Sequence, residues 1–344
     1  MSFRISNYSY HIINNLCRKE ETFVTKSFLL SMQKLNFNNR IKLSTKFLYK
    51  EIPIRFSRRI KELEALPIDL DDKNEIFTIR DWYVKSLDEI TKFKEPNNLI
   101  DCENYKEHIN KIFNRHNSTL ITMARGISKL DVDENKNFDN FLTNFYYNRT
   151  RTRFLLNNYL EYFNPDQNKI GILYKKFDLR KLIESVKTDL SFMSEIHKYE
   201  TPEINCNIES IKITYPIDYL HYSILEVLKN SLVAINNNEN GKINISCFSD
   251  KNILIIKIQD NGKGIKDENL GKIWNFSYTT SKISQNNKYS NDYEKTNPMS
   301  GFGYGLPISR ILLRTFDGDI KIYSEQNIGT TTYLFIDLNS NWKF

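Results

Sequence analysis

The sequence predicts an α plus α/β protein, in which an N-terminal four-helix bundle (residues 10–165) precedes an α/β-sandwich domain (residues 166–339). Three observations support this prediction. Long segments with apolar residues at helical spacing fill the first half. Short β-branched segments alternate with helical ones in the second half. Between the halves, residues 164–171 read "NPDQNKIG", the most turn-rich break in the chain. The length of 344 residues fits two domains.

Four amphipathic segments joined by short polar links indicate the bundle. In the first segment, Ile41, Leu48 and Ile60 are among the apolar residues at helical spacing, and Pro53 is expected to interrupt the helix. The third segment is expected to be one helix. The four segments are residues 39–67, 76–93, 105–130 and 138–163.

The second half predicts one mixed sheet with helices on one face, because helical segments are interleaved with hairpin-like strands. The expected helices include residues 177–193 and 216–235. The expected strands are residues 242–248, 252–260, 318–325 and 331–338, which alternate apolar with polar residues or are β-branched.

Composition excludes several classes of protein. The chain is 40% hydrophobic and 26% charged, as ordinary globular proteins are, and it has no apolar run of about 18 residues, so no membrane span is expected. The net charge of +7 is spread along the chain, which argues against nucleic-acid binding and leaves room for an acidic protein partner. The four cysteines lack C-x-x-C spacing, so neither a metal cluster nor a disulfide framework is expected.

A glycine run, "GFGYGLPISR" at residues 301–310, precedes a predicted helix. It is not a P-loop, because Leu306 and Pro307 stand where Lys and Ser or Thr would be required. It is not a dinucleotide fingerprint either, because the spacing is G-x-G-x-G and the preceding segment is polar. Glycines that lead into a helix N-terminus still suit phosphate, since free N–H groups and the positive end of the helix dipole meet there.

Glu226, Lys229 and Asn230 are predicted to share one face of the helix at residues 216–235. A solvated ion pair is the simplest interpretation of such a trio. The flanking residues are apolar, however, so the trio interrupts an otherwise buried helix. Glu226 could polarise an attacking hydroxyl, Lys229 could meet phosphate or orient the carboxylate, and Asn230 could bind Mg²⁺.

Asp260 ends a predicted strand and begins D-x-G-x-G with Gly262 and Gly264. This pattern fits a hairpin turn, and it equally fits an adenine pocket in which the carboxylate accepts the exocyclic amine. Thr279 and Thr280 stand at the edge of a long polar segment that could form a lid. Together with Gly329 and Thr330 near the last strand, the ordered elements predict an ATP site.

These ordered elements resemble those of the superfamily of gyrase, Hsp90, histidine kinases and MutL. More narrowly, the chain resembles the mitochondrial protein kinases of 2-oxo acid dehydrogenases, namely pyruvate dehydrogenase kinase and branched-chain 2-oxo acid dehydrogenase kinase. The resemblance covers roughly residues 10–339. Its motifs are "GFGYGLPISR" followed by "FDGDI", "KFLYKEIPIRFSRRIKELEALP", "RDWYVKSL", "RHNSTLITMARGI" and "FLTNFYYNRTRTRFLLNNY".

The resemblance implies a gyrase/Hsp90/histidine-kinase type of ATP-binding domain, with Glu226 as the base that activates a serine and Lys229 as a second catalytic residue. It places Asn230 on Mg²⁺ and Asp260 on adenine. The residues expected to contact the nucleotide are Glu226, Asn230, Val233, Asp260, Gly262, Gly264, Thr279, Thr280, Gly301, Phe302, Gly303, Tyr304, Gly305, Leu306 and Thr330.

In pyruvate dehydrogenase kinases the bundle holds a small regulatory pocket for an oxo acid. The positions that match this pocket are Tyr83, Ser86, His116, Arg149 and Arg153. Phe113 stands where the family has a further arginine, which leaves oxo-acid control open. Tyr222 stands where pyruvate dehydrogenase kinases often have histidine, as in branched-chain kinases.

The resemblance therefore predicts a kinase of the mitochondrial matrix that uses ATP and Mg²⁺. It would phosphorylate a serine of the E1α subunit of a 2-oxo acid dehydrogenase and inactivate it. Pyruvate dehydrogenase is the favoured substrate, and the branched-chain enzyme is the alternative. A homodimer is expected, and a lipoyl domain of the E2 core is a further partner, although "NSNWKF" ends where the family's C-terminal arm would continue. The sequence is also compatible with a protein histidine kinase that has His116 as its acceptor, and with an inactive scaffold.

Overall fold

The computed structural model describes residues 6–66, 75–128, 136–197, 199, 202–236, 238, 240–276, 278 and 303–343. The chain forms two compact units. The first is Met1–Ile172 with Lys343–Phe344, and the second is Leu173–Trp342. The α plus α/β class predicted from the sequence is confirmed, because a helical unit precedes a unit built on a mixed sheet.

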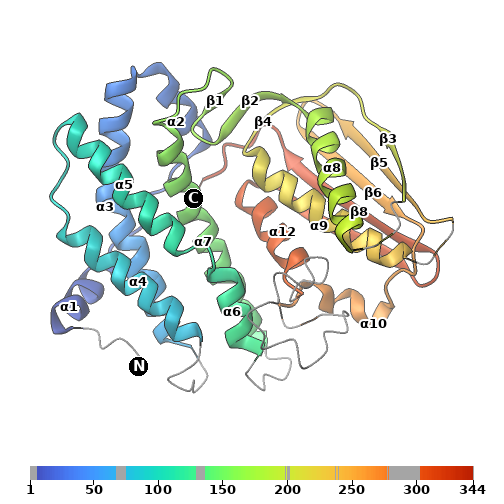
Figure 1. Cartoon of the computed structure of the whole chain (residues 1–344), viewed down its shortest axis with the longest axis horizontal. Helices are drawn as coiled ribbons and strands as arrows, with labels where there is room; N and C mark the ends of the chain where they lie inside the picture. The colour runs from blue at the N-terminus through green and yellow to red at the C-terminus, as the bar shows by residue number, and fades with distance from the viewer. Residues whose placement is uncertain are drawn as a thin grey trace. The chain divides into compact units, whose positions relative to one another are not determined.

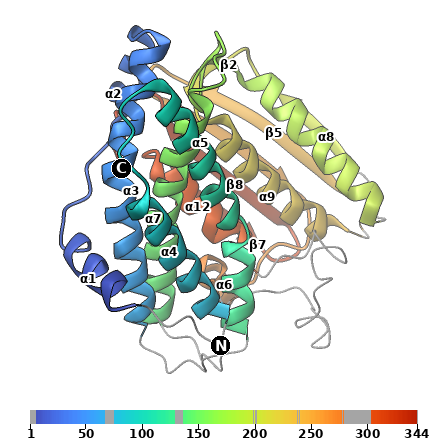
Figure 2. The ribbon, with the colours of Figure 1, turned by 60° about the vertical axis from the view of Figure 1, so that its left-hand side comes forward.

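The first unit is built on four long helices that lie side by side (Figure 2). They are α3 (Phe37–Glu64), α4 (Glu75–Lys92), α5 (Leu99–Arg115) and α7 (Lys136–Glu161). Shorter elements are α1 (Asn7–Leu16), α2 (Lys26–Ser31), η1 (Met32–Lys34), α6 (Thr119–Ser128) and β1 (Lys169–Ile170).

Two local expectations for these helices were wrong. Pro53 does not interrupt its helix, because α3 continues through it from Phe37 to Glu64. The neighbouring Ile52 and Phe56 are both buried, and their packing outweighs the one backbone hydrogen bond that proline removes. The predicted helix at residues 105–130 is two helices, since α5 ends at Arg115 and α6 begins at Thr119.

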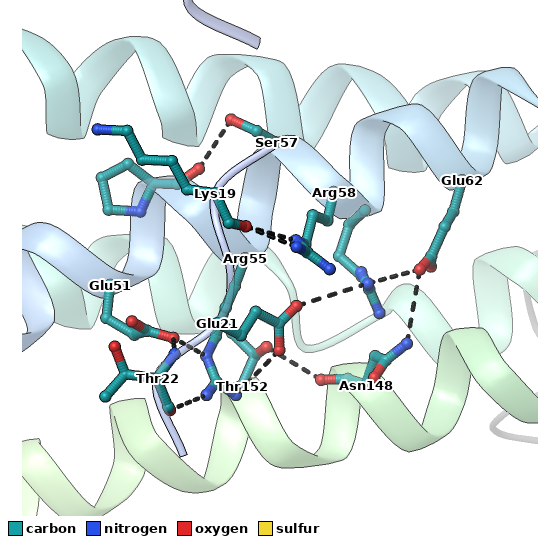
Figure 3. A network of polar contacts seen from close by, with 12 residues as sticks. Lys19, Glu21, Thr22, Glu51, Arg55, Ser57, Arg58, Glu62, Asn148 and Thr152 are labelled. Atoms are coloured by element: carbon teal, nitrogen blue, oxygen red, sulfur yellow. Dashed lines mark hydrogen bonds and ion pairs between the residues drawn. The ribbon is translucent and has the colours of Figure 1, made fainter. Parts of the chain in front are cut away.

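An ion-pair network fastens the segment before α2 to the middle of α3 (Figure 3). Arg55, which is 1% exposed, donates to Glu51 at 2.8 Å and to the carbonyl of Thr22 at 3.0 Å. The backbone N–H of Thr22 donates in turn to Glu51 at 3.0 Å. Buried charges require such pairing, so the network fixes the segment's position on α3.

The second unit contains a five-stranded sheet in the order β3-β5-β6-β8-β7. The strands are β3 (Glu203–Asn207), β5 (Lys242–Ser249), β6 (Ile253–Asp260), β8 (Gly329–Asp337) and β7 (Asp319–Glu325). β3 is parallel to β5 and the other pairs are antiparallel, so the sheet is mixed as predicted. A separate antiparallel pair joins β2 (Leu173–Asp178) to β4 (Lys212–Tyr215).

Helices cover one face of this sheet. α9 (Ile217–Ile235) packs on β6 and β8, α12 (Gly305–Thr315) packs on β7 and β8, and α8 (Leu179–His197) packs beside α9 (Figure 1). In chain order, α10 (Asp267–Leu270) and η2 (Lys272–Trp274) come between β6 and α12. Alternate strand residues, including Ile256 and Leu334, point toward the helices and form the core.

Two findings bear on the sequence-based exclusions. Within the described ranges, no helix has both the length and the apolar character needed to cross a bilayer. All four cysteines are free thiols.

Candidate active site

Glu226 and Lys229 lie one turn apart on α9 and form an ion pair. The Lys229 Nζ donates to Glu226 Oε1 at 2.6 Å, and the lysine and glutamate side chains are only 11% and 15% exposed. The pairing follows from their i, i+3 spacing on a helix whose other faces pack into the core. One carboxylate oxygen is therefore held by the lysine, while Oε2 is left to face another element.

Oε2 of Glu226 faces Gly305, the first residue of α12. A Cβ built on Gly305 would collide with Oε2 of Glu226, so only glycine lets the helix N-terminus approach the carboxylate this closely. α12 begins at Gly305, where backbone N–H groups lack partners within the helix. The bare backbone at Gly305 therefore permits a close contact between a carboxylate and a helix N-terminus.

Asp260 ends β6 and is 5% exposed. Its Oδ1 accepts from the backbone N–H groups of Gly262 at 3.0 Å and Thr330 at 3.2 Å, and its Oδ2 accepts from the hydroxyl of Ser231 at 2.8 Å. The β6–β8 register brings Thr330 opposite Asp260. Burial raises the pKa of Asp260, against the lowering effect of these three hydrogen bonds. A carboxylate has about four lone-pair sites, so one site on Oδ2 is left for a ligand.

The glycines after Asp260 stand where backbone segments meet. A Cβ on Gly262 would lie 2.7 Å from the backbone of Ala234 at the end of α9. Gly264 has φ +64 and would collide with the Glu325 carbonyl. The D-x-G-x-G loop is thus wedged between α9 and the β7–β8 turn.

The other nucleotide-site predictions fall into three groups. Asn230 and Val233 are exposed on α9, one and two turns after Glu226. At the start of α12, Leu306 lies half-buried in the first turn, and Gly303, with φ +87, precedes the helix. Tyr304 is 5% exposed and packs edge-on against Phe276, with ring centroids 5.1 Å apart. Outside the described residues lie Thr279, Thr280, Gly301 and Phe302.

A second cluster lies in the helical unit, where the five predicted pocket residues come together. Ser86 Oγ lies 3.0 Å from His116 Nε2, and the rings of Tyr83 and His116 are 4.4 Å apart. Arg149 donates to the carbonyl of His116 at 2.9 Å. A cavity of about 10 Å³ lies among them, lined by Phe56, Tyr83, His116, Arg149, Thr152, Arg153 and Leu156.

His116 is neutral in this cluster. Burial, followed by the charges of Arg149, Arg115 and Arg153, lowers its pKa to about 3. Its Nδ1 is buried and has no hydrogen-bond partner among the described residues. A histidine that is 4% exposed and held by Ser86 is poorly placed to be a phosphoacceptor, which argues against the histidine-kinase alternative.

Phe113 contributes to the same cluster in an unexpected way. The guanidinium of Arg153 stacks over the Phe113 ring at 4.0 Å and donates to the Phe113 carbonyl at 3.2 Å. It also donates to Asn117 Oδ1 at 2.9 Å. The phenylalanine therefore orients an arginine of the cluster.

Sequence reasoning missed several residues that build these sites. Ser231 supports Asp260, Phe276 packs on Tyr304, and Phe56 and Thr152 line the cavity. Ser231 carried one usable signal, because it directly follows Asn230 on the helix. The other contacts depend on which elements pack together.

Two family models match the chain. Residues 24–185 match the mitochondrial branched-chain alpha-ketoacid dehydrogenase kinase model, and residues 217–340 match the histidine kinase-, DNA gyrase B-, and HSP90-like ATPase model. A mitochondrial [pyruvate dehydrogenase (acetyl-transferring)] kinase of Arabidopsis thaliana is 30% identical, over 93% of this chain and 91% of the relative. The mitochondrial [pyruvate dehydrogenase (acetyl-transferring)] kinase isozyme 4 of Homo sapiens is 28% identical, over 84% of this chain and 75% of the relative. Isozyme 3 of Homo sapiens is 28% identical, over 88% of this chain and 80% of the relative.

The chain belongs to the mitochondrial pyruvate dehydrogenase kinase family. Members of this family are protein kinases, and the ATPase domain match extends from before Glu226 to beyond Thr330. The chain is accordingly a mitochondrial protein kinase that uses ATP.

Proposed function

We propose that this kinase transfers the γ-phosphoryl group of ATP to a serine of the E1α subunit of pyruvate dehydrogenase in the mitochondrial matrix, and thereby inactivates that enzyme. The observation that carries the proposal is the contact between the Glu226 carboxylate and the N-terminus of α12 at Gly305. A base and a phosphate-binding helix end then stand side by side, as serine phosphorylation requires.

The roles follow from the geometry of the pair. Glu226 accepts the proton of the serine hydroxyl while the serine oxygen bonds to the γ-phosphorus and the bond from that phosphorus to the ADP oxygen breaks. Lys229 holds Oε1 at 2.6 Å, which orients the carboxylate and leaves Oε2 for the proton. The N–H groups of the first turn of α12 stabilise phosphate charge.

Asn230 is the protein ligand that we propose for Mg²⁺. Its side chain is exposed on α9, one turn after Glu226. The described residues contain no group of three acidic, His or Cys ligands that could hold a metal. A single amide oxygen from Asn230 fits Mg²⁺, which commonly takes one or two protein oxygens and completes its shell with water and substrate phosphates. When bound, Mg²⁺ neutralises charge on the phosphates.

We propose that Asp260 binds the exocyclic amine of adenine. Three of its lone-pair sites are filled by Ser231, Gly262 and Thr330, and the remaining site suits an N–H donor. Gly262, Gly264 and Thr330 then form the surrounding backbone of the adenine pocket, with Val233 on α9, and Thr279, Thr280, Gly301 and Phe302 belong to the same proposal.

The substitution E226Q tests the catalytic assignment. We expect it to lower the rate of serine phosphorylation about 10²- to 10⁴-fold, the usual worth of a general base, while Mg-ADP binding is retained. The matched control is E184Q on α8, because Glu184 also pairs with a lysine three residues later but lies outside the site. Activity would be measured with purified E1 of pyruvate dehydrogenase and of the branched-chain enzyme, with mapping of the phosphorylated residue.

Two results would contradict the proposal. Unchanged phosphorylation by E226Q would remove Glu226 as the base. Modification of the branched-chain E1 alone would reassign the substrate.

We further propose that the cavity around His116 binds a small carboxylate such as a 2-oxo acid. Arg149 and Arg153 line it, and guanidinium groups suit carboxylate. The space of about 10 Å³ is about that of one water molecule, so the ligand must widen it.

Thermal unfolding with millimolar pyruvate tests the cavity. We expect a rise in midpoint for the unmodified chain and none for R149M. R80M is the control, because Arg80 pairs with Asp81 and does not line the cavity. An equal rise in R149M would show that pyruvate binds elsewhere.

For the partners, we propose a homodimer, with a lipoyl domain of the E2 core as a second partner. Support for the dimer comes from the sheet face opposite the helices of the second unit. Phe248, Ile255 and Phe335 form one cross-strand row there, and Tyr323 is 62% exposed. Such a row is typical of an interface.

A further inference from the structure

A clasp of two ring contacts holds α12 against the segment that follows α10. Tyr304, just before α12, packs edge-on against Phe276 at 5.1 Å. Further along, the guanidinium of Arg310 lies 4.4 Å from the ring centroid of Trp274, at the end of η2. Trp274 and Phe276 are two residues apart in the segment after α10, and Tyr304 and Arg310 are six residues apart around α12.

Arg310 is fixed from both sides. Besides lying over Trp274, it donates from Nε to Asp319 Oδ1 at 3.0 Å, and both side chains are partly buried, at 28% and 30% exposure. Asp319 begins β7. Arg310 therefore joins three elements, namely α12, η2 and β7.

The position of α12 controls two parts of the proposed site at once. Its N-terminus presents the N–H groups for phosphate, and its first residue touches Glu226 with no space to spare. A shift of α12 by a few tenths of an ångström would change both. α12 packs on η2, where the clasp acts, and it also packs on α9, which carries Glu226.

We propose that Arg310 and Trp274 are positioning residues for the phosphate-binding end of α12. Neither residue belongs to the proposed nucleotide contacts, and both act through α12, whose N-terminus does. The proposal rests on the proposed ATP site and adds to it the residues that set its geometry.

A purely structural role is the competing interpretation, and Arg314 separates the two. Arg314 lies one turn later on α12 and pairs with the same Asp319 at 3.1 Å, but it is 48% exposed. R314M removes a comparable ion pair while the stack of Arg310 on Trp274 stays intact, so it is the matched control.

The experiment compares binding of Mg-ADP and of adenosine by calorimetry, in the full chain. We expect R310M and W274L each to weaken Mg-ADP about three- to tenfold, the worth of a partly buried cation–π contact with its ion pair. Adenosine, which has no phosphate, should bind these variants as it binds the unmodified chain. R314M should stay within about twofold for both ligands, and R310K should restore part of the Mg-ADP affinity because it keeps a cation over the ring.

The double variant R310M/W274L should bind no more weakly than the weaker single variant, since the two side chains act as one contact. Folded R310M and W274L with unchanged Mg-ADP affinity would overturn the inference, as would equal losses for Mg-ADP and adenosine. Failure of the unmodified chain to bind Mg-ADP would overturn the proposed function itself, and the unmodified chain is measured first for that reason.

Discussion

At the scale of single residues, the glycines of this kinase serve different physical needs. Gly305 makes room for the far end of a flexible side chain, Glu226. Gly262 makes room for backbone at Ala234, which cannot move without the helix that carries it. Gly271 has no atom within 4 Å of an added Cβ. Alanine should therefore affect catalysis at Gly305, folding at Gly262, and neither at Gly271.

We expect G305A to lower the rate of phosphorylation at least tenfold while the protein stays folded. The added methyl displaces the Glu226 carboxylate, and a misplaced base costs rate steeply. Stability should change by less than about 1 kcal/mol, because alanine suits a helix better than glycine. Phosphorylation rates and thermal unfolding of the same preparation check this.

Two glycine variants serve as controls for G305A. G271A should be unchanged in rate and stability, and G262A should lower the free energy of unfolding because its methyl meets backbone 2.7 Å away. A G305A protein with full activity would show that the contact with Glu226 is irrelevant to catalysis.

At the scale of elements, the break between α5 and α6 builds the second cluster. Apolar spacing continues from residue 105 to residue 130, so the pattern alone predicts one helix. The chain instead turns at His116, whose carbonyl accepts from the hydroxyl of Thr119 at 2.9 Å. The turn directs the His116 ring to Ser86 on α4, in a site where burial and three arginines exclude the charged imidazole.

This burial makes the stability of the bundle dependent on pH. In the unfolded chain His116 titrates near its ordinary value of 6.5, whereas in the folded chain its pKa is about 3. Between these values only the unfolded state binds the proton. The free energy of unfolding therefore does not depend on His116 protonation above about pH 6.5. It falls as the pH is lowered from there toward about 3, by up to about 1.4 kcal/mol per pH unit.

The substitution H116Q tests this dependence, because glutamine does not titrate. Urea unfolding between about pH 7.5 and about pH 5, a range that spans the ordinary histidine pKa, should show a smaller loss of stability on acidification in H116Q than in the unmodified chain. The exposed His11 gives the control variant H11Q, which should keep the original slope. Identical slopes in all three proteins would mean that His116 is accessible to protons in the folded state.

At the scale of the whole molecule, the sequence predicted what periodicity and ordered motifs encode. α3, α4, α7, α9 and strands β5 to β8 all follow from long apolar patterns, whereas the third pattern ran across the break between α5 and α6. Glu226 and Asp260 were singled out as candidates by motif order. β3 escaped because it is an exposed edge strand reading "EINCN", without alternation. The contacts of Trp274 and Arg310 were not predicted, because they depend on how strands and helices pack, which local spacing does not encode.

The open sheet face also belongs to this scale, because it concerns the assembly rather than one site. Phe248 on β5 is 57% exposed and pairs across the strands with Ile255, which pairs with Phe335. If two copies associate through this face, F248K places a charge in an apolar interface. We expect it to weaken the dimer by about 1–3 kcal/mol, or roughly 5- to 150-fold in dissociation constant.

The control is F192K, because Phe192 is 64% exposed but lies on α8, away from that face. Sedimentation over a range of concentrations measures both constants. A dimer that F192K dissociates and F248K leaves intact would move the interface to α8, and a monomer at all concentrations would remove the dimer.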